Sequence, residues 1–336
     1  MRIVVEWNRV QPSALRPPNW NLPDRGCARG LHPCAPWRGV RAQLRAIRAL
    51  RDAQGGVEAM VVLSGTPRWA RQPAYGCQDE DEGGELRGVS AAGLPGYRRL
   101  IISLAALARR EGVNVRWWSP RNEPNSSRFL APQRLRCSAA APSLAAGLYA
   151  PLVRTMRSAL RAAPGSQSIV MGELASPYRR RPGITETHEF VRALPRDVVC
   201  TGGVWSQHRY VGDADDLPAL KRLVGARRCP GPPPRFWITE TGVGLRRIAG
   251  RLARRNLNLA ALRAGCRAQH VLLRRWHADR QVDVALQYTY REDPAFTVGL
   301  ADPGLDDLYP TYELWRAWGQ RSLGAPPPSL PLACQG

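Results

Sequence analysis

Hydrophobic and polar residues along the chain follow two alternating spacings. Short runs rich in Val, Ile and aromatic residues are typical of buried strands, whereas apolar residues at every third or fourth position are typical of one helix face. Between residues 40 and 53, for example, Val40, Leu44 and Ile47 share one face and arginines occupy the other. Seven segments have the strand pattern, namely residues 2–7, 57–63, 113–119, 168–173, 198–206, 235–239 and 282–288. Seven others have the helical pattern, namely residues 40–53, 97–110, 144–161, 186–194, 217–224, 256–279 and 312–321.

The order of these segments predicts the fold class. Strands that alternate with helices pair in parallel through right-handed crossovers, so we expect an α/β sheet. Seven strand-helix units are one short of the eight that close a TIM (β/α)8 barrel, which is the fold that we predict. No repeat or linker divides the chain, so we expect one barrel domain over residues 1–323. A Pro-rich tail over residues 324–336 is expected to lie on the surface, pinned by Cys334.

Composition narrows the possible partners. The chain has 336 residues, of which 44% are hydrophobic and 23% charged, as in an ordinary globular protein. Its formal net charge of +22 comes almost entirely from arginine, since Lys221 is the only lysine. A basic surface attracts phosphates, acidic glycans or anionic membranes without identifying any of them. Because no nucleic-acid motif accompanies the arginines and no apolar run approaches ~18 residues, we predict neither a nucleic-acid partner nor a membrane span.

The eight cysteines indicate disulfides rather than a metal site. They form no CxxC pair and no Cys/His cluster, so we predict no metal. Six lie in loop-like, Pro/Gly-rich stretches, which fits disulfides in an oxidising compartment and therefore a secreted protein. These six are Cys27, Cys34, Cys77, Cys137, Cys229 and Cys334. Cys200 and Cys266 fall in a predicted strand and helix, where we expect them to be merely buried.

A secreted protein carries a signal peptide, yet the first residues of this chain already have the pattern of a strand. Two explanations remain open at this point. Either the signal peptide has been removed, or Met1 is not the natural start.

Two glutamates stand where a parallel barrel places its chemistry, at the carboxyl ends of strands. Glu123 follows the third predicted strand in Asn-Glu-Pro, and Glu240 ends the sixth in Trp-Ile-Thr-Glu-Thr-Gly. Either one alone could form an ion pair in so arginine-rich a chain. Both together, each beside aromatic residues and outside any helical pair, are poorly explained by solvation.

These two motifs resemble the acid/base and nucleophile motifs of the retaining (β/α)8 glycoside hydrolases of clan A. In that clan the glutamates belong to the fourth and seventh strands, whereas they follow the third and sixth predicted strands here. The resemblance therefore implies that the strand at Arg2 corresponds to the second strand of the clan. It also implies that the first β/α unit is missing and that the chain starts late.

Further segments narrow the resemblance. Residues 64–70, Ser-Gly-Thr-Pro-Arg-Trp-Ala, are similar to the segment after the third clan strand in family 39, whereas family 5 usually carries a histidine there. The nearest relatives implied are thus family-39-like or family-5-like enzymes. The last predicted strand lacks the Trp that many clan members place there, which puts the subsite built on that strand in doubt.

The resemblance also implies roles for individual residues. Arg2 resembles the arginine that hydrogen-bonds the nucleophile, and Asn122 resembles the asparagine that holds the sugar 2-hydroxyl. His208 and Tyr210 resemble a His-x-Tyr pair whose hydroxyl touches the nucleophile. For Arg2 the alternative is a surface residue at a frayed terminus, and for His208 it is a core histidine. Tryptophans suit stacking on sugars, and Trp69, Trp205 and Trp237 lie at or near predicted strand ends.

The implied function is a retaining glycoside hydrolase that cleaves O-glycosyl bonds of a β-linked glycoside or polysaccharide. Glu123 would be the acid/base and Glu240 the nucleophile, with their carboxyl groups about 5 to 5.5 Å apart. We expect a carbohydrate substrate, no cofactor and a monomer. The alternative is a carbohydrate-binding barrel without catalysis. Two other acidic sites are Glu173, which ends a predicted strand, and the pair Glu292-Asp293, which follows the last one. Either could bind a hydroxyl, but we expect them to be solvated loop residues.

Overall fold

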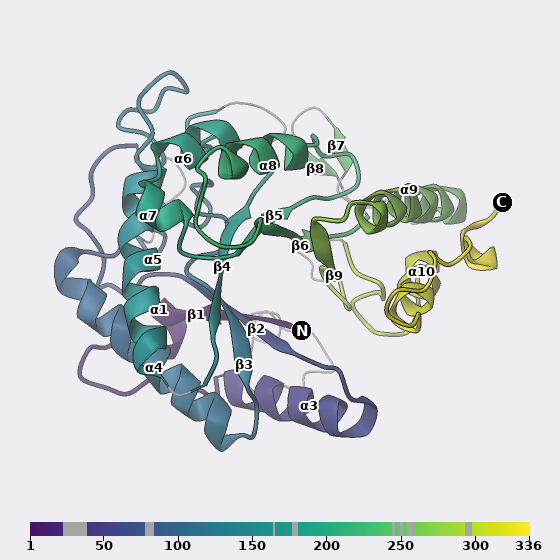
Figure 1. Cartoon of the computed structure of the whole chain (residues 1–336), viewed down its shortest axis with the longest axis horizontal. Helices are drawn as coiled ribbons and strands as arrows, with labels where there is room; N and C mark the ends of the chain where they lie inside the picture. Colours follow the sequence, from purple (N-terminus) through teal and green to yellow (C-terminus); the bar gives the residue numbers. More distant parts are fainter. Residues whose placement is uncertain are drawn as a thin grey trace. The chain divides into compact units, whose positions relative to one another are not determined.

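The computed structural model describes residues 1–22, 39–77, 84–163, 165–176, 181–243, 246–248, 251–253, 258–292 and 298–336. They form two compact units (Figure 1). The first unit holds the described residues of 1–22, 39–207 and 215–235. The second holds residues 208–214 and the described residues of 236–336.

Parallel strands form the centre of the first unit. They are β1 (Arg2–Glu6), β2 (Ala59–Ser64), β3 (Val115–Ser119), β4 (Ser168–Leu174) and β5 (Val204–His208), whose last residue is grouped with the second unit. Each strand pairs with the next one along the chain, as expected when helical crossovers join them. Arg2 lies opposite Met60, and Glu6 opposite Ser64, so the carboxyl ends of β1 and β2 are level. Every residue of β2 is buried, as is typical of a parallel strand covered on both faces.

Helices connect these strands. They are α1 (Trp7–Val10), α3 (Gly39–Gln54), α4 (Leu94–Arg110), α5 (Ala145–Ala162), α6 (Thr187–Ala193), α7 (Arg196–Val199) and α8 (Leu217–Gly225), with a 3-10 turn η1 (Ala91–Gly93) before α4. The α4 and α5 helices pack against each other and lie side by side in Figure 1. Leu100, Leu104 and Leu107 of α4 recur at helical spacing and are buried, which confirms the apolar face predicted from the sequence.

The second unit is built on two parallel strands, β6 (Arg235–Thr241) and β9 (Val282–Gln287). A hairpin of β7 (Arg246–Ile248) and β8 (Arg251–Ala253) lies between them in sequence. The α9 helix (Leu259–Ala278) packs against α10 (Pro310–Gly319), and both contact the 3-10 turn η2 (Leu332–Cys334). Asn258 caps α9 by accepting the backbone N–H of Ala260 at 2.8 Å.

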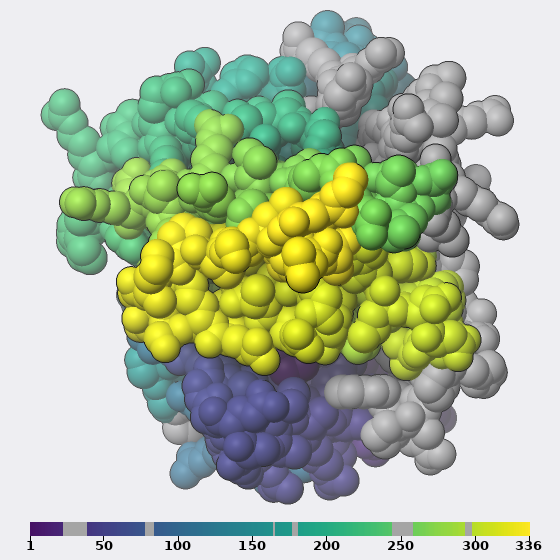
Figure 2. Space-filling model, turned by 90° about the vertical axis from the view of Figure 1, so that its right-hand side faces the viewer, coloured from purple at the N-terminus to yellow at the C-terminus, as the bar shows by residue number. Residues whose placement is uncertain are grey.

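The C-terminal tail is fastened to this unit as predicted. Cys334 forms a disulfide with Cys266 of α9, and Arg267 donates to the backbone carbonyl groups of Cys334 and Gly336. Figure 2 shows the last residues, in yellow, on the surface of the molecule. A covalent link and hydrogen bonds at the chain end explain how so Pro-rich a segment keeps a defined position.

Three disulfides occur among the described residues, and they correct one prediction. Besides Cys266–Cys334, the structure has Cys77–Cys137 and Cys200–Cys229. The expectation that Cys200 and Cys266 are merely buried is wrong, because both are bonded to loop or tail cysteines. Two further cysteines that we expected in disulfides, Cys27 and Cys34, lie outside the described residues.

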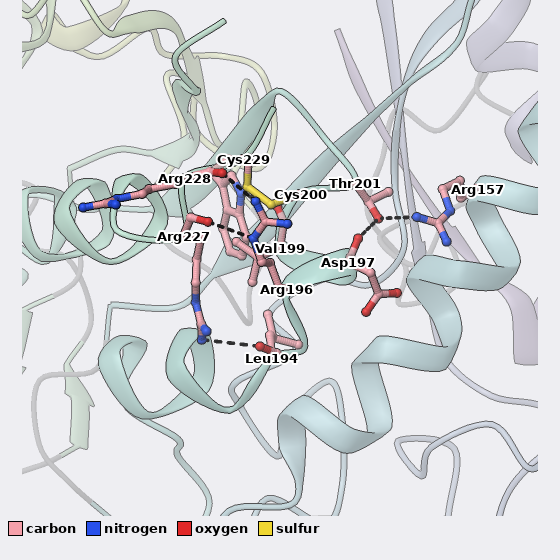
Figure 3. The surroundings of a disulfide bond; sticks show 11 residues. Arg157, Leu194, Arg196, Asp197, Val199, Cys200, Thr201, Arg227, Arg228 and Cys229 are labelled. Carbon is pink, nitrogen blue, oxygen red and sulfur yellow. Dashed lines mark hydrogen bonds between the residues drawn. A yellow bond between two sulfur atoms is a disulfide. The ribbon is translucent and has the colours of Figure 1, made fainter. Parts of the chain in front are cut away.

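Figure 3 shows the Cys200–Cys229 disulfide together with arginines of the neighbouring helix and loop. Arg196 of α7 donates to the carbonyl oxygens of Arg227 at 3.1 Å and Arg228 at 2.7 Å, both in the loop after α8. Arg227 in turn donates to the carbonyl oxygen of Leu194 at 3.4 Å. These arginines therefore join α6, α7 and α8 by binding backbone oxygens that the helix ends leave without helical partners.

All seven predicted strands are present, and their boundaries agree to within about two residues except at the start of β5. Residues 198 and 199 were predicted to begin a strand, but they form the end of α7, and β5 begins at Val204. Val198 and Val199 lie in this helical turn and are buried. The prediction that they are buried was therefore correct, whereas the prediction that they form a strand was wrong. Within the described residues, every helix is too short or too polar to cross a bilayer.

Candidate active site

The Asn-Glu-Pro segment follows β3 in the first unit. Glu123 has a left-handed backbone with φ of 36°, which is uncommon for a residue other than glycine. Its carbonyl oxygen accepts the N–H of Ser126 at 2.9 Å, and the N–H of Asn122 donates to Leu63 at the end of β2. Glu123 is half-buried and Asn122 is buried. The turn therefore fixes the direction in which the glutamate leaves the strand end.

The side chain of Arg121 stabilises this turn through hydrogen bonds. Its guanidinium is buried and donates to the carbonyl oxygens of Phe129 at 2.7 Å and Gly65 at 3.0 Å, and to the hydroxyl of Thr66 at 3.2 Å. One side chain thus connects the segment after β3 to the segment after β2. This role could not be predicted, because nothing in the sequence distinguishes Arg121 from the many other arginines.

A buried ion pair lies beside the same turn. Nε and Nη2 of Arg2 donate to Oε2 of Glu173, at 2.9 and 2.6 Å, and Nη2 also donates to Oδ1 of Asn122. The side chain of Arg2 is 6% exposed and that of Glu173 is 0% exposed. The alternative of a surface arginine at a frayed terminus is therefore wrong.

Glu173 is the residue that sequence reasoning misjudged most clearly. It was expected to be solvated at the end of its strand, but it is fully buried within β4. Its Oε1 accepts the hydroxyl of Ser206 at 3.0 Å, and its backbone N–H donates to the same Ser206 oxygen at 2.9 Å. The available signal was a carboxylate inside an otherwise apolar strand run, since such a group must be paired when it is buried.

Glu292 is a second correction of the same kind. It was expected to be solvated, but it is buried and accepts the hydroxyl of Tyr309 at 3.3 Å. Its neighbour Asp293 lies outside the described residues.

In the second unit, Glu240 receives the predicted contact from Tyr210 and a further contact from His208. The hydroxyl of Tyr210 donates to Oε2 of Glu240 at 2.6 Å, and Nδ1 of His208 lies 3.3 Å from the same oxygen. The backbone N–H of Arg209 donates to the carbonyl oxygen of Glu240 at 2.9 Å. All three side chains of this cluster are at least nine-tenths buried. The His-x-Tyr segment therefore contacts the Glu240 carboxylate through two side chains and the Glu240 backbone through one N–H.

The predicted tryptophans have different surroundings. Trp69 is half-buried, donates to the carbonyl oxygen of Gln11 at 3.1 Å, and makes an edge-to-face contact with Trp7 at 5.2 Å. Trp237 lies in β6 and is 6% exposed. Trp205 is 0% exposed and donates to Val199 at 3.4 Å, so its ring belongs to the hydrophobic core.

Two buried tyrosines near the first unit's strand ends stay protonated. Burial raises the pKa of Tyr97, whose hydroxyl donates to the carbonyl oxygen of Pro120 at 2.7 Å. Burial also raises the pKa of Tyr149, and the negative charge of Glu173 raises it further against the opposing hydrogen bond from Gly172. Both are therefore neutral hydrogen-bonding groups at any ordinary pH.

Neither a protein-family model nor a curated protein matches the chain. Solved structures do match. The family 30 subfamily 8 xylanase Xyn30A from Clostridium acetobutylicum has a TM-score of 0.51 at 12% identity, over 92% of this chain and 61% of that one. SrfJ from Salmonella typhimurium has a TM-score of 0.51 at 10% identity, over 91% and 62%. A conserved exported protein from Bacteroides fragilis has a TM-score of 0.50 at 14% identity, over 87% and 60%.

At these identities the likeness concerns the fold alone. It confirms the predicted α/β barrel class, and the seven parallel strands described are one fewer than a closed (β/α)8 barrel has. The chain spans about three fifths of the length of each of these structures.

Proposed function

We propose that the chain is a retaining glycoside hydrolase that acts on a β-linked glycoside or polysaccharide. The observation that carries the proposal is the buried cluster of Tyr210, His208 and Glu240 at a strand end. Two further facts support it: the Asn-Glu-Pro turn after β3, and the fold likeness to a xylanase. The family stays a proposal as well, since residues 64–70 favour a family-39-like enzyme whereas this xylanase belongs to family 30.

In the first chemical step, the carboxylate of Glu240 attacks the anomeric carbon. The carboxylic acid of Glu123 protonates the glycosidic oxygen as the bond between that oxygen and the anomeric carbon breaks. Such chemistry requires the two carboxyl groups to be about 5 to 5.5 Å apart. Tyr210 and His208 hold the attacking carboxylate in one orientation, which reduces the entropy lost in reaching the transition state.

In the second step, the Glu123 carboxylate takes a proton from water. The water oxygen attacks the anomeric carbon, and Glu240 leaves as a carboxylate, so the enzyme returns to its starting state. Asn122 holds the 2-hydroxyl of the sugar, while Trp69 and Trp237 contact its apolar face. The predicted hydrogen bond from Arg2 to the nucleophile is retained as part of the proposal. Trp205 is omitted because its ring lies in the core.

We further propose that the enzyme works outside the cytoplasm, as a monomer and without a cofactor. The three disulfides of the described residues support this location, because such bonds persist in oxidising compartments. The exported neighbour from Bacteroides fragilis agrees with it.

The test is to incubate the protein with 4-nitrophenyl β-glycosides of xylose, galactose and glucose, and with the corresponding 2-deoxy-2-fluoro glycosides as traps. A retaining hydrolase releases nitrophenol and then carries the trapped sugar on the peptide that contains Glu240, which mass spectrometry detects. Label on another carboxylate would contradict the assignment of the nucleophile. Binding of oligosaccharides without any turnover would favour the carbohydrate-binding barrel instead.

A further inference from the structure

The Arg2 guanidinium binds both the carboxylate of Glu173 and the Asn122 side chain of the Asn-Glu-Pro turn. We propose that Glu173 is a positioning residue for sugar recognition: it holds the Arg2 guanidinium, and Arg2 fixes the Asn122 amide with its NH2 group turned toward the substrate. This inference rests on the proposed glycosidase function and adds a carboxylate that the sequence motifs do not include.

The first step of the argument is the direction of the Asn122 amide. A guanidinium can only donate hydrogen bonds, so the atom of Asn122 that meets Nη2 of Arg2 must be the carbonyl oxygen Oδ1. Rotating the amide by half a turn would place two donors against each other. The Nδ2 group is therefore the end of Asn122 that can serve a ligand, and it recognises an acceptor such as a hydroxyl oxygen.

The second step is the position of Arg2. Both Nε and Nη2 of Arg2 bind one oxygen, Oε2 of Glu173, at 2.9 and 2.6 Å. The pair is buried, and removing one partner of a buried ion pair leaves an uncompensated charge that must move or be neutralised. Without the Glu173 carboxylate, the guanidinium loses the ion pair that holds it beside Asn122.

The third step is the position of Glu173 itself. The hydroxyl of Ser206 in β5 donates to Oε1 of Glu173 and accepts the backbone N–H of the same residue. Ser206 therefore holds both the side chain and the backbone of Glu173. The backbone is left-handed at Glu173, with φ of 53°, and at Gly172, with φ of 93°. A Cβ on Gly172 would lie 2.4 Å from the carbonyl oxygen of Ser206, so only glycine allows this approach of β4 to β5.

The three steps form a single chain of contacts: Ser206 orients Glu173, Glu173 holds Arg2, and Arg2 orients Asn122. Glu173 acts on the substrate only through the two residues after it. Its loss should therefore affect recognition of the one hydroxyl that Asn122 binds, rather than every substrate equally.

The experiment compares an aryl β-glycoside that the wild-type protein hydrolyses with its 2-deoxy analogue. We expect Glu173→Gln to lower kcat/KM for the parent glycoside about 10-fold or more, the size of effect of a lost hydrogen bond to a charged group. For the 2-deoxy analogue, which lacks the hydroxyl, the same change should have little effect. The double variant Glu173→Gln with Asn122→Ala should be no slower on the parent than Asn122→Ala alone.

The matched control is Glu111→Gln. Glu111 is another buried glutamate of the first unit and pairs with Arg41 at 2.6 Å and Arg45 at 2.7 Å, at the end of α4. This control should leave the preference for the parent over the 2-deoxy substrate unchanged. If Glu173→Gln does not fold, Ser206→Ala is used, because it keeps the ion pair and removes only the hydroxyl that orients the carboxylate.

The outcomes separate the two proposals. Equal losses on both substrates, or multiplying losses in the double variant, would reject the positioning role while leaving the hydrolase intact. If the wild-type protein hydrolyses no glycoside in the panel, the proposed function itself is rejected, and the positioning role with it.

Discussion

The hydroxyl of Tyr210 donates a 2.6 Å hydrogen bond to Oε2 of Glu240. The two residues are thirty positions apart in sequence, and the tyrosine is anchored by its own N–H, which donates to Asp213 at 3.0 Å. The contact with Asp213 thus holds the tyrosine in position as a preorganised donor to the carboxylate. Such preorganisation is expected around a nucleophile. His208 lies 3.3 Å from the same oxygen and completes the support.

Replacing Tyr210 by Phe should therefore reduce kcat/KM about 10- to 100-fold with little change in folding, because one hydrogen bond to a charged group is lost. Steady-state kinetics on the best aryl glycoside measure this effect. Tyr75, a half-exposed tyrosine of the first unit, offers a control in Tyr75→Phe, which should not alter the rate. Equal rates for Tyr210→Phe and wild type would show that the contact does not assist the reaction.

The two glutamates proposed to be catalytic should differ in their response to the leaving group. Glu240→Ala should lose about 10,000-fold or more on every substrate, because the attacking group is gone. Glu123→Ala should lose about 100- to 10,000-fold on substrates with poor leaving groups and far less on nitrophenyl glycosides, which need no protonation. A series of aryl glycosides with leaving groups of different acidity gives the comparison.

The control for both is Glu313→Gln, since Glu313 forms only a surface ion pair with Arg316 in α10. Equal loss on good and poor leaving groups in Glu123→Ala would count against the acid role.

The Cys266–Cys334 disulfide should stabilise the second unit. Its two cysteines are 68 residues apart in sequence, so closing the loop reduces the entropy of the unfolded chain and raises its free energy by about 4 kcal/mol in the simple chain model. We expect Cys266→Ser with Cys334→Ser to lower the melting temperature measured by circular dichroism. Treatment with a reductant breaks this bond in the wild type and should lower its melting temperature. The double variant has no such bond to lose, so this contribution should be absent. An unchanged melting temperature in the double variant would mean that the tail adds no stability.

The Glu111 carboxyl group should make stability depend on pH in the acidic range. A hydrogen bond from Arg45 lowers its pKa below the usual value of 4.5, with smaller contributions from Arg41, although burial opposes the shift. A lowered pKa in the folded state means that the stabilisation is complete above about pH 4.5. It is lost as the pH falls through the lower, folded value.

Urea unfolding between pH 3 and pH 7 tests this expectation. The wild type should exceed Glu111→Gln in stability by a constant amount at neutral pH, and the difference should shrink below pH 4.5. Asp52→Asn, which removes an exposed carboxylate beside Arg51, is the matched surface control. A difference that stays constant down to pH 3 would contradict the lowered pKa.

The periodicity of the chain was sufficient to predict its elements and their order. Burial repeats every second residue in strands and every third or fourth in helices, so the pattern of apolar residues records which face is covered. This is why the seven strands, and the places of Glu123 and Glu240 at two strand ends, followed from the sequence. The largest boundary error, at Val198 and Val199, arose because a short buried helix and a buried strand have the same apolar run.

Partners across the fold could not be obtained in this way. Arg2 and Glu173 are 171 residues apart, and Cys266 and Cys334 are paired from a helix and a tail. Composition and spacing are local properties, whereas an ion pair or a disulfide depends on which strand ends and helix faces meet after folding. The sequence by itself determined the fold class and the strand ends that carry Glu123 and Glu240. Only the tertiary structure decided that Glu173 is buried against Arg2 and Ser206, because a charge can be buried only where folding supplies its partners.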